Sequence, residues 1–405
     1  MLKPCTVKNR LKPSLLAAFS KVFCFMFFIV SASINAADID VKIYHLSHND
    51  LTNYAINPLL VEPENAGLAG AALGISDSNT TGKFLGQHYT LQPIHLEHVT
   101  DIPKATINWA KHLPQAGLIL SDLASPYLQQ LLAYNATLST PHLIINVSNR
   151  DNSLRQTQCT QMLLHTTPSN AQITDALGQW LLSKRLNRVF LIDGDTSEDD
   201  RWVASFERTA KRYKLKIDAS KKWTFDTDLR RTVSQDIPLF TQTSRPYDVV
   251  VVADTHQRFG QYVPYNTYYP RPVIGTAGLV ADTWHPSIEQ WGARQLQNRF
   301  YEQHARSMLH QDYDAYVAVR AIAYGVQQTQ SMDPTKLAAF LRSESFQLAA
   351  YKGRKLTFRD YNGQLRMPIE LTHPLGLVAR APQEGFMHPI TDLDTLGFDR
   401  REVCQ

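Results

Sequence analysis

Cysteine is scarce in this 405-residue chain, and several familiar signatures are missing. None of the four cysteines forms a CxxC pair, which excludes zinc ribbons and thioredoxin chemistry. No segment approaches the roughly 20 apolar residues that a membrane-spanning helix needs. P-loop, GxGxxG, HExxH and GxSxG motifs are also absent. The sequence therefore predicts no catalytic residue, no cofactor and no metal, and we expect a protein that is not an enzyme.

The positive charge of the chain is concentrated at its amino terminus. Five Lys or Arg residues and no Asp or Glu lie in the first 36 residues, so setting them aside changes the formal net charge from +4 to −1. A chain so close to neutrality has no general electrostatic reason to bind nucleic acid or an anionic membrane. We expect neither as a partner.

The same amino-terminal segment has the order of parts typical of a secretory signal peptide. A basic stretch ends at Lys21, an apolar run covers residues 22–30, and small or polar residues follow up to Ala36. We expect cleavage after Ala36, which would release a periplasmic protein with no membrane insertion of its own. An uncleaved amino-terminal anchor is the alternative.

Two cysteines remain after residue 36. In an exported protein, Cys159 and Cys404 could form a disulfide that ties the carboxyl-terminal tail to the middle of the chain. Two separate buried thiols are the alternative, because sequence alone does not place the two residues in space.

The remaining chain predicts two α/β halves, since its length exceeds that of a usual single domain and short apolar runs alternate with helical periodicity. Such βαβ units require parallel sheets with helices on both faces. The first half is expected to have strands at 41–46, 89–96, 117–121 and 142–147, with helices at 65–78, 103–113 and 125–134. The second half is expected to have a helix capped by Ser169, strands at 189–192, 215–219, 248–253 and 273–275, and a helix at 197–213. Helices at 287–308, at 313–328 and from Pro334, then strands with an Asn362-Gly363 hairpin signal, complete the chain.

Small residues at three helical positions have a packing explanation. Gly67, Gly70 and Gly74 lie at i, i+3 and i+7 inside an expected helix, which is not the spacing of a dinucleotide-binding loop. We expect them to let this helix pack closely on a sheet.

Candidate binding residues follow from their positions after the expected strands. In open parallel sheets, ligands bind outside the carboxyl ends of the strands. Ser125, as the expected N-cap of a helix, could offer its hydroxyl and nearby N–H groups to a carboxylate. Asp195 could meet a cationic group of a ligand. The full set of candidates is Ser125, Ser148, Asn149, Arg150, Asp195, Asp254 and Thr255, and each of them could equally cap or close a turn.

Short motifs spread over nearly the whole chain carry a family resemblance. They include the run 67–75, Thr81-Gly82-Lys83, Leu164-His165-Thr166, Trp284-His285-Pro286, Asn362-Gly363-Gln364 and Leu396-Gly397-Phe398-Asp399. With these motifs the chain resembles the type I periplasmic binding proteins of branched-chain amino acid ABC transporters. It looks closest to the subgroup associated with PQQ-dependent alcohol dehydrogenase systems.

The resemblance implies two Rossmann-like lobes joined by a hinge, with a small solute bound between them. Lobe 1 would comprise residues 37–150 and 285–343, and lobe 2 would comprise residues 151–284 and 344–405. An ABC transporter permease would be the partner. The Gly-Ala-Thr run usual in this family is replaced by Ser148-Asn149-Arg150, which argues against branched-chain amino acids as ligands.

Two other functions stay open at this stage. The protein could be a periplasmic sensor or a docking partner of a dehydrogenase that has kept the fold without transport. An enzyme would need a nucleophile and a base close together in the cleft. Ser148 with a histidine is conceivable, but no motif supports it.

Overall fold

The computed structural model describes residues 38–48, 61–96, 107–114, 116–224 and 232–403. The expected signal peptide, the beginning of the expected helix at 103–113 and Cys404 therefore lie outside the described residues. Within the described ranges, no helix combines the length and the apolar character needed to cross a membrane.

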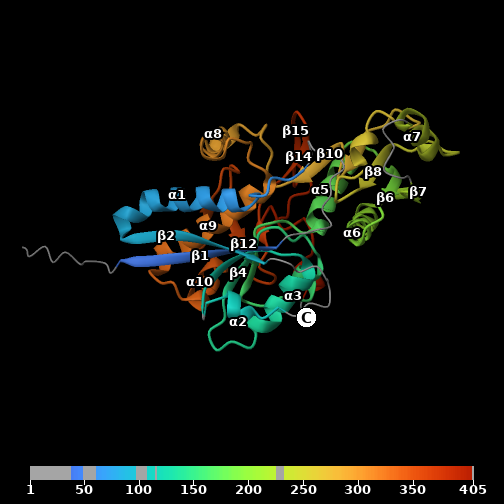
Figure 1. Cartoon of the computed structure of the whole chain (residues 1–405). Coiled ribbons are helices and arrows are strands. Elements are labelled where there is room, and N and C mark those ends of the chain that lie inside the picture. The colour runs from blue at the N-terminus through green and yellow to red at the C-terminus, as the bar shows by residue number, and fades with distance from the viewer. Residues whose placement is uncertain (1–37, 49–60, 97–106, 115, 225–231, 404–405) are drawn as a thin grey trace, which may run out of the picture. The chain divides into compact units, whose positions relative to one another are not determined.

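The first sheet has five parallel strands in the order β2-β1-β3-β4-β5. Figure 1 labels three of them, β1, β2 and β4. The strands β3 and β4 each begin with three apolar residues in a row and are buried there, as expected for strands covered on both faces. The strands are β1 (Ile39–His48), β2 (Gln87–Leu96), β3 (Leu118–Asp122), β4 (Leu143–Asn146) and β5 (Leu163–His165). Four of them confirm the prediction, whereas β5 lies in a stretch expected to be irregular.

Helices cover both faces of the first sheet because its side chains alternate between two cores. Leu118 and Leu120 join the core under α1, α8 and α9, whereas Ile119 joins the core under α2 and α3. These helices are α1 (Leu68–Leu85), α2 (Trp109–His112), α3 (Ser125–Asn135), α8 (Ala293–His304) and α9 (His310–Thr329), with α10 (Pro334–Leu341) beside them and the short α4 (Ser153–Gln156) after β4.

Two of the three small residues, Gly70 and Gly74 of α1, face α9 and not, as expected, the sheet, whereas Gly67 is the N-cap before α1. A Cβ atom on Gly70 would lie 1.8 Å from the backbone oxygen of Asp312, and one on Gly74 would lie 2.9 Å from Cβ of Val319. The backbone of α1 can approach α9 this closely only because no side chain stands between them. The start of α1 is fixed by the same neighbour, since the N–H of Gly67 donates to the Asp312 carboxylate at 3.0 Å.

The second sheet has seven strands in the order β15-β14-β10-β9-β8-β6-β7. Its strands pair in parallel except β14, which runs antiparallel to both β10 and β15. The strands are β6 (Arg188–Asp193), β7 (Lys216–Lys222), β8 (Val249–Ala253), β9 (Val273–Gly275), β10 (Leu279–Asp282), β14 (Ile369–His373) and β15 (Gly376–Ala381). One face packs on α5 (Asn170–Ser183) and α6 (Ser197–Tyr213), and the other on α7 (Val233–Thr241) and the turn with η3 (Gly260–Tyr262).

Local signals set the ends of two helices beside this sheet. Ser169 caps α5 in a capping box with Gln172, which confirms the prediction. At α6 the cap is Thr196 with Asp199, one residue before the expected Ser197.

The expected helix at 287–308 begins only at Ala293, because the chain turns through η4 (Gln290–Gly292) with Trp291 at φ 54°.

The chain passes between the two sheets three times. It leaves the first sheet after β5, returns after β10 to form α8, α9 and α10, and leaves again before β14. A small third sheet precedes this last passage and packs on the core of the first sheet; it contains β11 (Leu348–Ala349), β12 (Lys355–Phe358) and β13 (Leu365–Arg366). Residues 150 and 343 are the predicted ends of the two parts of lobe 1. Beyond them, β5 still belongs to the first sheet and β11–β13 pack on its core. The exact lobe boundaries stay a prediction.

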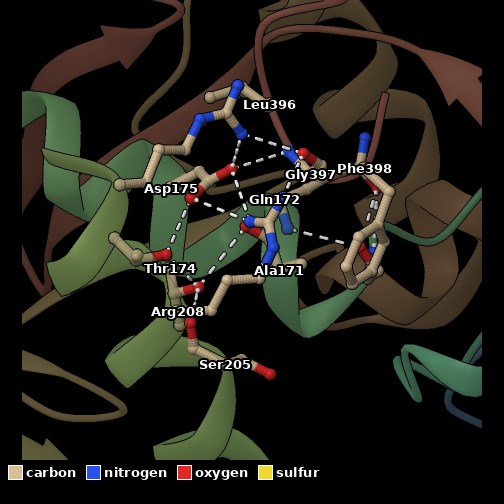
Figure 2. A network of polar contacts seen from close by, with 12 residues as sticks. Ala171, Gln172, Thr174, Asp175, Ser205, Arg208, Leu396, Gly397 and Phe398 are labelled. Atoms are coloured by element: carbon tan, nitrogen blue, oxygen red, sulfur yellow. Dashed lines mark hydrogen bonds and ion pairs between the residues drawn. The ribbon is translucent and has the colours of Figure 1, made fainter. Parts of the chain in front are cut away.

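The carboxyl-terminal segment is held against α5 and α6 by a buried carboxylate (Figure 2). Asp175 accepts hydrogen bonds from Arg208 at 3.2 Å, from Arg212 at 2.6 Å and from the N–H of Gly397 at 2.8 Å. Arg208 also lies over the ring of Phe398 at 4.5 Å. The carboxylate of Asp175 therefore connects this segment, which contains η5 (Arg400–Glu402), with both α5 and α6.

Candidate functional site

A cavity of about 530 Å³ lies between loops that follow strands of the first sheet and loops that follow strands of the second sheet. Its lining includes residues 122–125 after β3, 148–151 after β4 and 255–257 after β8, together with residues at the starts of α6 and α9. The carboxyl ends of parallel strands thus supply most of the lining, as the rule for open α/β sheets predicts. Five candidates line the cavity: Ser125, Ser148, Asn149, Arg150 and Thr255.

Ser125 begins α3 but is not its N-cap, which is Ala124. Its hydroxyl donates a hydrogen bond of 2.9 Å to the carboxylate of Asp151 and accepts one of 3.1 Å from the amide of Asn149. Asp151 in turn accepts from the N–H of Ser153 at 3.0 Å. The hydroxyl that was expected to receive a ligand carboxylate therefore already holds a carboxylate of this chain.

The loop that carries these residues is fixed from below by two buried side chains. Asn146, at the end of β4, accepts from the N–H of Asn149 at 2.9 Å and donates to the carbonyl of the same residue at 2.8 Å. Arg155 is 1% exposed and donates to the carbonyls of Asn149 at 2.7 Å and Asp151 at 3.1 Å. Because both side chains bind the backbone of Asn149 or Asp151, they hold the loop that carries Ser148 and Arg150 in one conformation.

Arg150 spans the two sheets. Its guanidinium forms an ion pair of 2.7 Å with Asp282, the last residue of β10, whose other oxygen lies 3.2 Å from Nδ1 of His310. Burial alone would raise the pKa of Asp282, but Arg150 and His310 hold it below the usual value. Burial lowers the pKa of His310 to about 4, so this imidazole is neutral near pH 7. Arg150 is thus engaged by a carboxylate.

On the side of the second sheet, Thr255 and Arg201 also bind carboxylates. The hydroxyl and the N–H of Thr255 both donate to the buried Asp199 at 2.7 Å. Arg201 pairs with Glu198, and a hydrogen bond with His256 lowers the pKa of Glu198 to about 2. In this part of the lining, Arg201 balances the charge of Glu198, and neutral donors hold Asp199.

The two remaining ligand candidates lie outside the cavity lining. Asp254 is 2% exposed and accepts from the N–H groups of Arg258, Phe259 and Gly260 at 2.9, 2.7 and 2.6 Å, so it closes the turn after β8. Asp195 forms an ion pair with Arg258. Both carboxylates satisfy the local backbone or a neighbouring cation.

Several acidic residues that sequence analysis did not select also line the cavity. They are Glu62, Glu64, Asp122, Asp151 and Glu198. Asp122 directly follows the buried part of β3 and could have been found by the rule that selected Ser148. Glu62 and Glu64 lie outside any βα turn, and no signal in the sequence places them here.

The arrangement is suited to binding. In the described ranges, no group of three or more His, Cys, Asp or Glu side chains is placed to hold a metal ion. Local hydrogen bonds hold most of the polar side chains of the lining named above. For three of them, Asp122, Glu64 and Ser148, no hydrogen bond of the side chain is seen within the described ranges. The groups without such a partner, Asp122, Glu64 and Ser148, are therefore the ones open to a solute.

Comparison with known proteins identifies the fold. No protein-family model and no curated protein matches the sequence. Among solved structures, a solute-binding protein of an ABC transporter from R. palustris, in complex with benzoate, superposes with a TM-score of 0.63 over 85% of this chain and 98% of that chain at 12% identity.

Two further structures have the same architecture. The leucine-, isoleucine-, valine-, threonine- and alanine-binding protein of Brucella ovis, in its closed conformation, gives a TM-score of 0.64 at 11% identity and covers 82% of this chain and 89% of that chain. A branched-chain amino acid ABC transporter periplasmic ligand-binding protein of Burkholderia xenovorans gives 0.62 at 17% identity, with 84% and 95% covered. The chain has the type I periplasmic binding protein fold, which confirms the expected fold class.

Proposed function

We propose that this protein is a periplasmic solute-binding protein that captures a small polar molecule in the cavity and delivers it to an ABC transporter permease. The observation that carries the proposal is the cavity itself. It is lined from both sheets, at the carboxyl ends of their strands, and its volume of about 530 Å³ suits a small molecule. The similarity to solute-binding proteins in fold supports the same function.

Hinged closure of two lobes is part of this proposal. Each sheet has its own pair of apolar cores, and the chain joins the sheets only through the three passages described above. Two such bodies can close on a solute if the open and closed states differ by only a few kcal/mol, because ligand binding then shifts the population. The lining residues act by binding and orientation, with no catalytic role.

The link to PQQ-dependent alcohol oxidation rests on the sequence motifs alone. If it holds, the solute belongs to the metabolism served by such a dehydrogenase. The second candidate function is a periplasmic sensor or docking partner of a dehydrogenase, which the replacement of the Gly-Ala-Thr run by Ser148-Asn149-Arg150 favours. Co-purification with a dehydrogenase, without stabilisation by any solute, would favour this second function.

Thermal unfolding with a panel of metabolites tests the proposal. A ligand that binds only the native state stabilises it by RT ln(1 + [L]/Kd), which is about 2.7 kcal/mol at a hundredfold excess over Kd. We expect one chemical class in a panel of amines, alcohols, organic acids and amino acids to raise the unfolding temperature. A panel without any stabilising compound would contradict solute binding.

A further inference from the structure

Four hydrogen-bond donors of the cavity lining are already bound to carboxylates that belong to the chain. Ser125 donates to Asp151, Arg150 to Asp282, Thr255 to Asp199 and Arg201 to Glu198. A ligand carboxylate would have to displace one of these internal partners. Since each is a charge-assisted hydrogen bond, that exchange gives little net free energy.

The first of these pairs lies where an anionic ligand group would be expected. The Ser125 hydroxyl is at the first turn of α3, whose partial positive charge attracts anions. Asp151 reaches this hydroxyl from the loop after β4, and its second oxygen is held by the N–H of Ser153. The chain therefore supplies its own anion at this helix terminus.

Two other acids of the lining leave negative charge without a counter-ion, because Asp122 and Glu64 form no ion pair with any described residue. Glu62 differs from them: it accepts a hydrogen bond of 2.7 Å from Gln311, and burial raises its pKa. His45 interacts electrostatically with Asp122, but it is 1% exposed and burial lowers its pKa. Near pH 7 His45 is therefore neutral and supplies no positive charge to Asp122. His48 also lines the cavity, and its Nδ1 contacts the backbone carbonyl of Asp122 at 3.4 Å.

Resting on the proposed function, we infer that the solute is a small organic cation with a primary ammonium group and no carboxylate. The ammonium group would meet Asp122 and Glu64, the two carboxylates with free acceptor capacity, while the Ser148 hydroxyl binds a polar group of the solute. No Phe, Tyr or Trp is among the described lining residues. A primary ammonium donates hydrogen bonds to carboxylates such as these, whereas a quaternary one depends on aromatic faces.

Titration calorimetry with compounds of one size tests this class of ligand. The probes are n-butylammonium, 1,4-diaminobutane, tetramethylammonium, butyrate and 1-butanol, added to the exported protein. We expect the two primary amines to bind at a stoichiometry of one, and tetramethylammonium, butyrate and butanol to bind at least about tenfold more weakly, which corresponds to 1.4 kcal/mol.

Variants identify the carboxylates that take part. Asp122→Asn should weaken binding of the amines at least about tenfold. The matched control is Asp40→Asn, because Asp40 is exposed on β1 far along the strand from the cavity lining. Equal affinities in Asp122→Asn, Asp40→Asn and the parent protein would overturn the inference.

Asp151→Ser tests the role of Asp151 through a gain of butyrate binding, which a variant that is only destabilised would not show. Serine can still accept from the N–H of Ser153, so the loop is kept while the negative charge at α3 is removed. We expect this variant to bind butyrate. Failure to gain butyrate binding would contradict the role given to Asp151.

The outcomes separate this inference from the proposed function. Binding of butyrate or butanol by the parent protein, without binding of amines, would overturn the inference and leave solute capture intact. If neither these probes nor the metabolite panel is bound, solute capture fails, and the inference fails with it.

Discussion

Arg150 and Asp282 form an ion pair of 2.7 Å that joins the loop after β4 of the first sheet to the end of β10 in the second. The two side chains are 24% and 12% exposed, so water screens the pair only in part. Arg150 lines the cavity at the same time. Arg150 therefore both connects the two sheets and forms part of the cavity wall.

Removing either partner of this ion pair should destabilise the protein. We expect Arg150→Gln and Asp282→Asn each to lower the free energy of unfolding by about 1–3 kcal/mol, because hydrogen bonds between charged groups contribute that much. The double variant should lose less than the sum of the two, which a double-mutant cycle in denaturant measures. Strict additivity would show that the two residues do not interact.

The close contact between α1 and α9 predicts an effect of adding one methyl group. Gly70→Ala places Cβ 1.8 Å from the Asp312 carbonyl oxygen, so the helices must separate. We expect a loss of at least about 1–3 kcal/mol in the free energy of unfolding, as for overpacked cores. Gly376→Ala is the matched control, since nothing lies within 4 Å of its added Cβ. Equal stability of both variants would contradict the packing described for α1.

The clamp on the carboxyl-terminal segment depends on the charge of Asp175 (Figure 2). Asp175→Asn keeps the size of the side chain but removes the charge that holds Arg208 and Arg212, so we expect a loss of about 2–4 kcal/mol. The tail should also become more accessible, and trypsin should cleave at Arg400 and Arg401 faster than in the parent protein. An unchanged cleavage rate would show that Asp175 does not hold the tail.

Acid should destabilise the protein from about pH 6.5 downward. Burial lowers the pKa of His310 to about 4 from an ordinary value of 6.5, so between these values the unfolded chain binds a proton that the folded chain does not. Stability from this group is complete above pH 6.5 and is lost as the pH falls toward 4, with a slope of at most about 1.4 kcal/mol per pH unit. Denaturant unfolding between pH 8 and pH 4 measures the slope, and His310→Gln should reduce it. The same slope in both proteins would contradict a neutral His310.

The predicted Cys159–Cys404 disulfide has support from its surroundings. Cys159 packs against the small core of Ala171, Phe398 and Val403, and Val403 precedes Cys404 in the chain. We expect mass spectrometry of a non-reduced tryptic digest to show the peptides of Cys159 and Cys404 joined. Free thiols in the purified protein would instead support the alternative of two separate cysteines.

Most of the fold could be predicted because its signals are local. The helix predicted at 197–213 coincides with α6, since acids in its first turn, bases in its last turn and an apolar stripe all lie within that segment. The strands β5 and β10 were not predicted, because a run of three or four residues is too short to show a strand period. Their pairing with β4, β9 and β14 appears only in the folded chain.

The candidate site could be predicted in position but not in its contacts. Residues after β3, β4 and β8 do line the cavity, since the carboxyl ends of parallel strands lie at one edge of a sheet. Sequence could not show that Asp254 turns to its own backbone, nor that Arg150 meets a carboxylate 132 positions away. These partners depend on the folded chain, and they decide which charges of the cavity stay free.

Amide hydrogen exchange with and without a stabilising solute tests the central claim most directly. If a solute binds between the two sheets, exchange should slow both at residues 122–127 and 148–151, beside the first sheet, and at residues 255–257, beside the second. Protection confined to one sheet, or located away from the cavity, would contradict solute capture by both halves of the molecule.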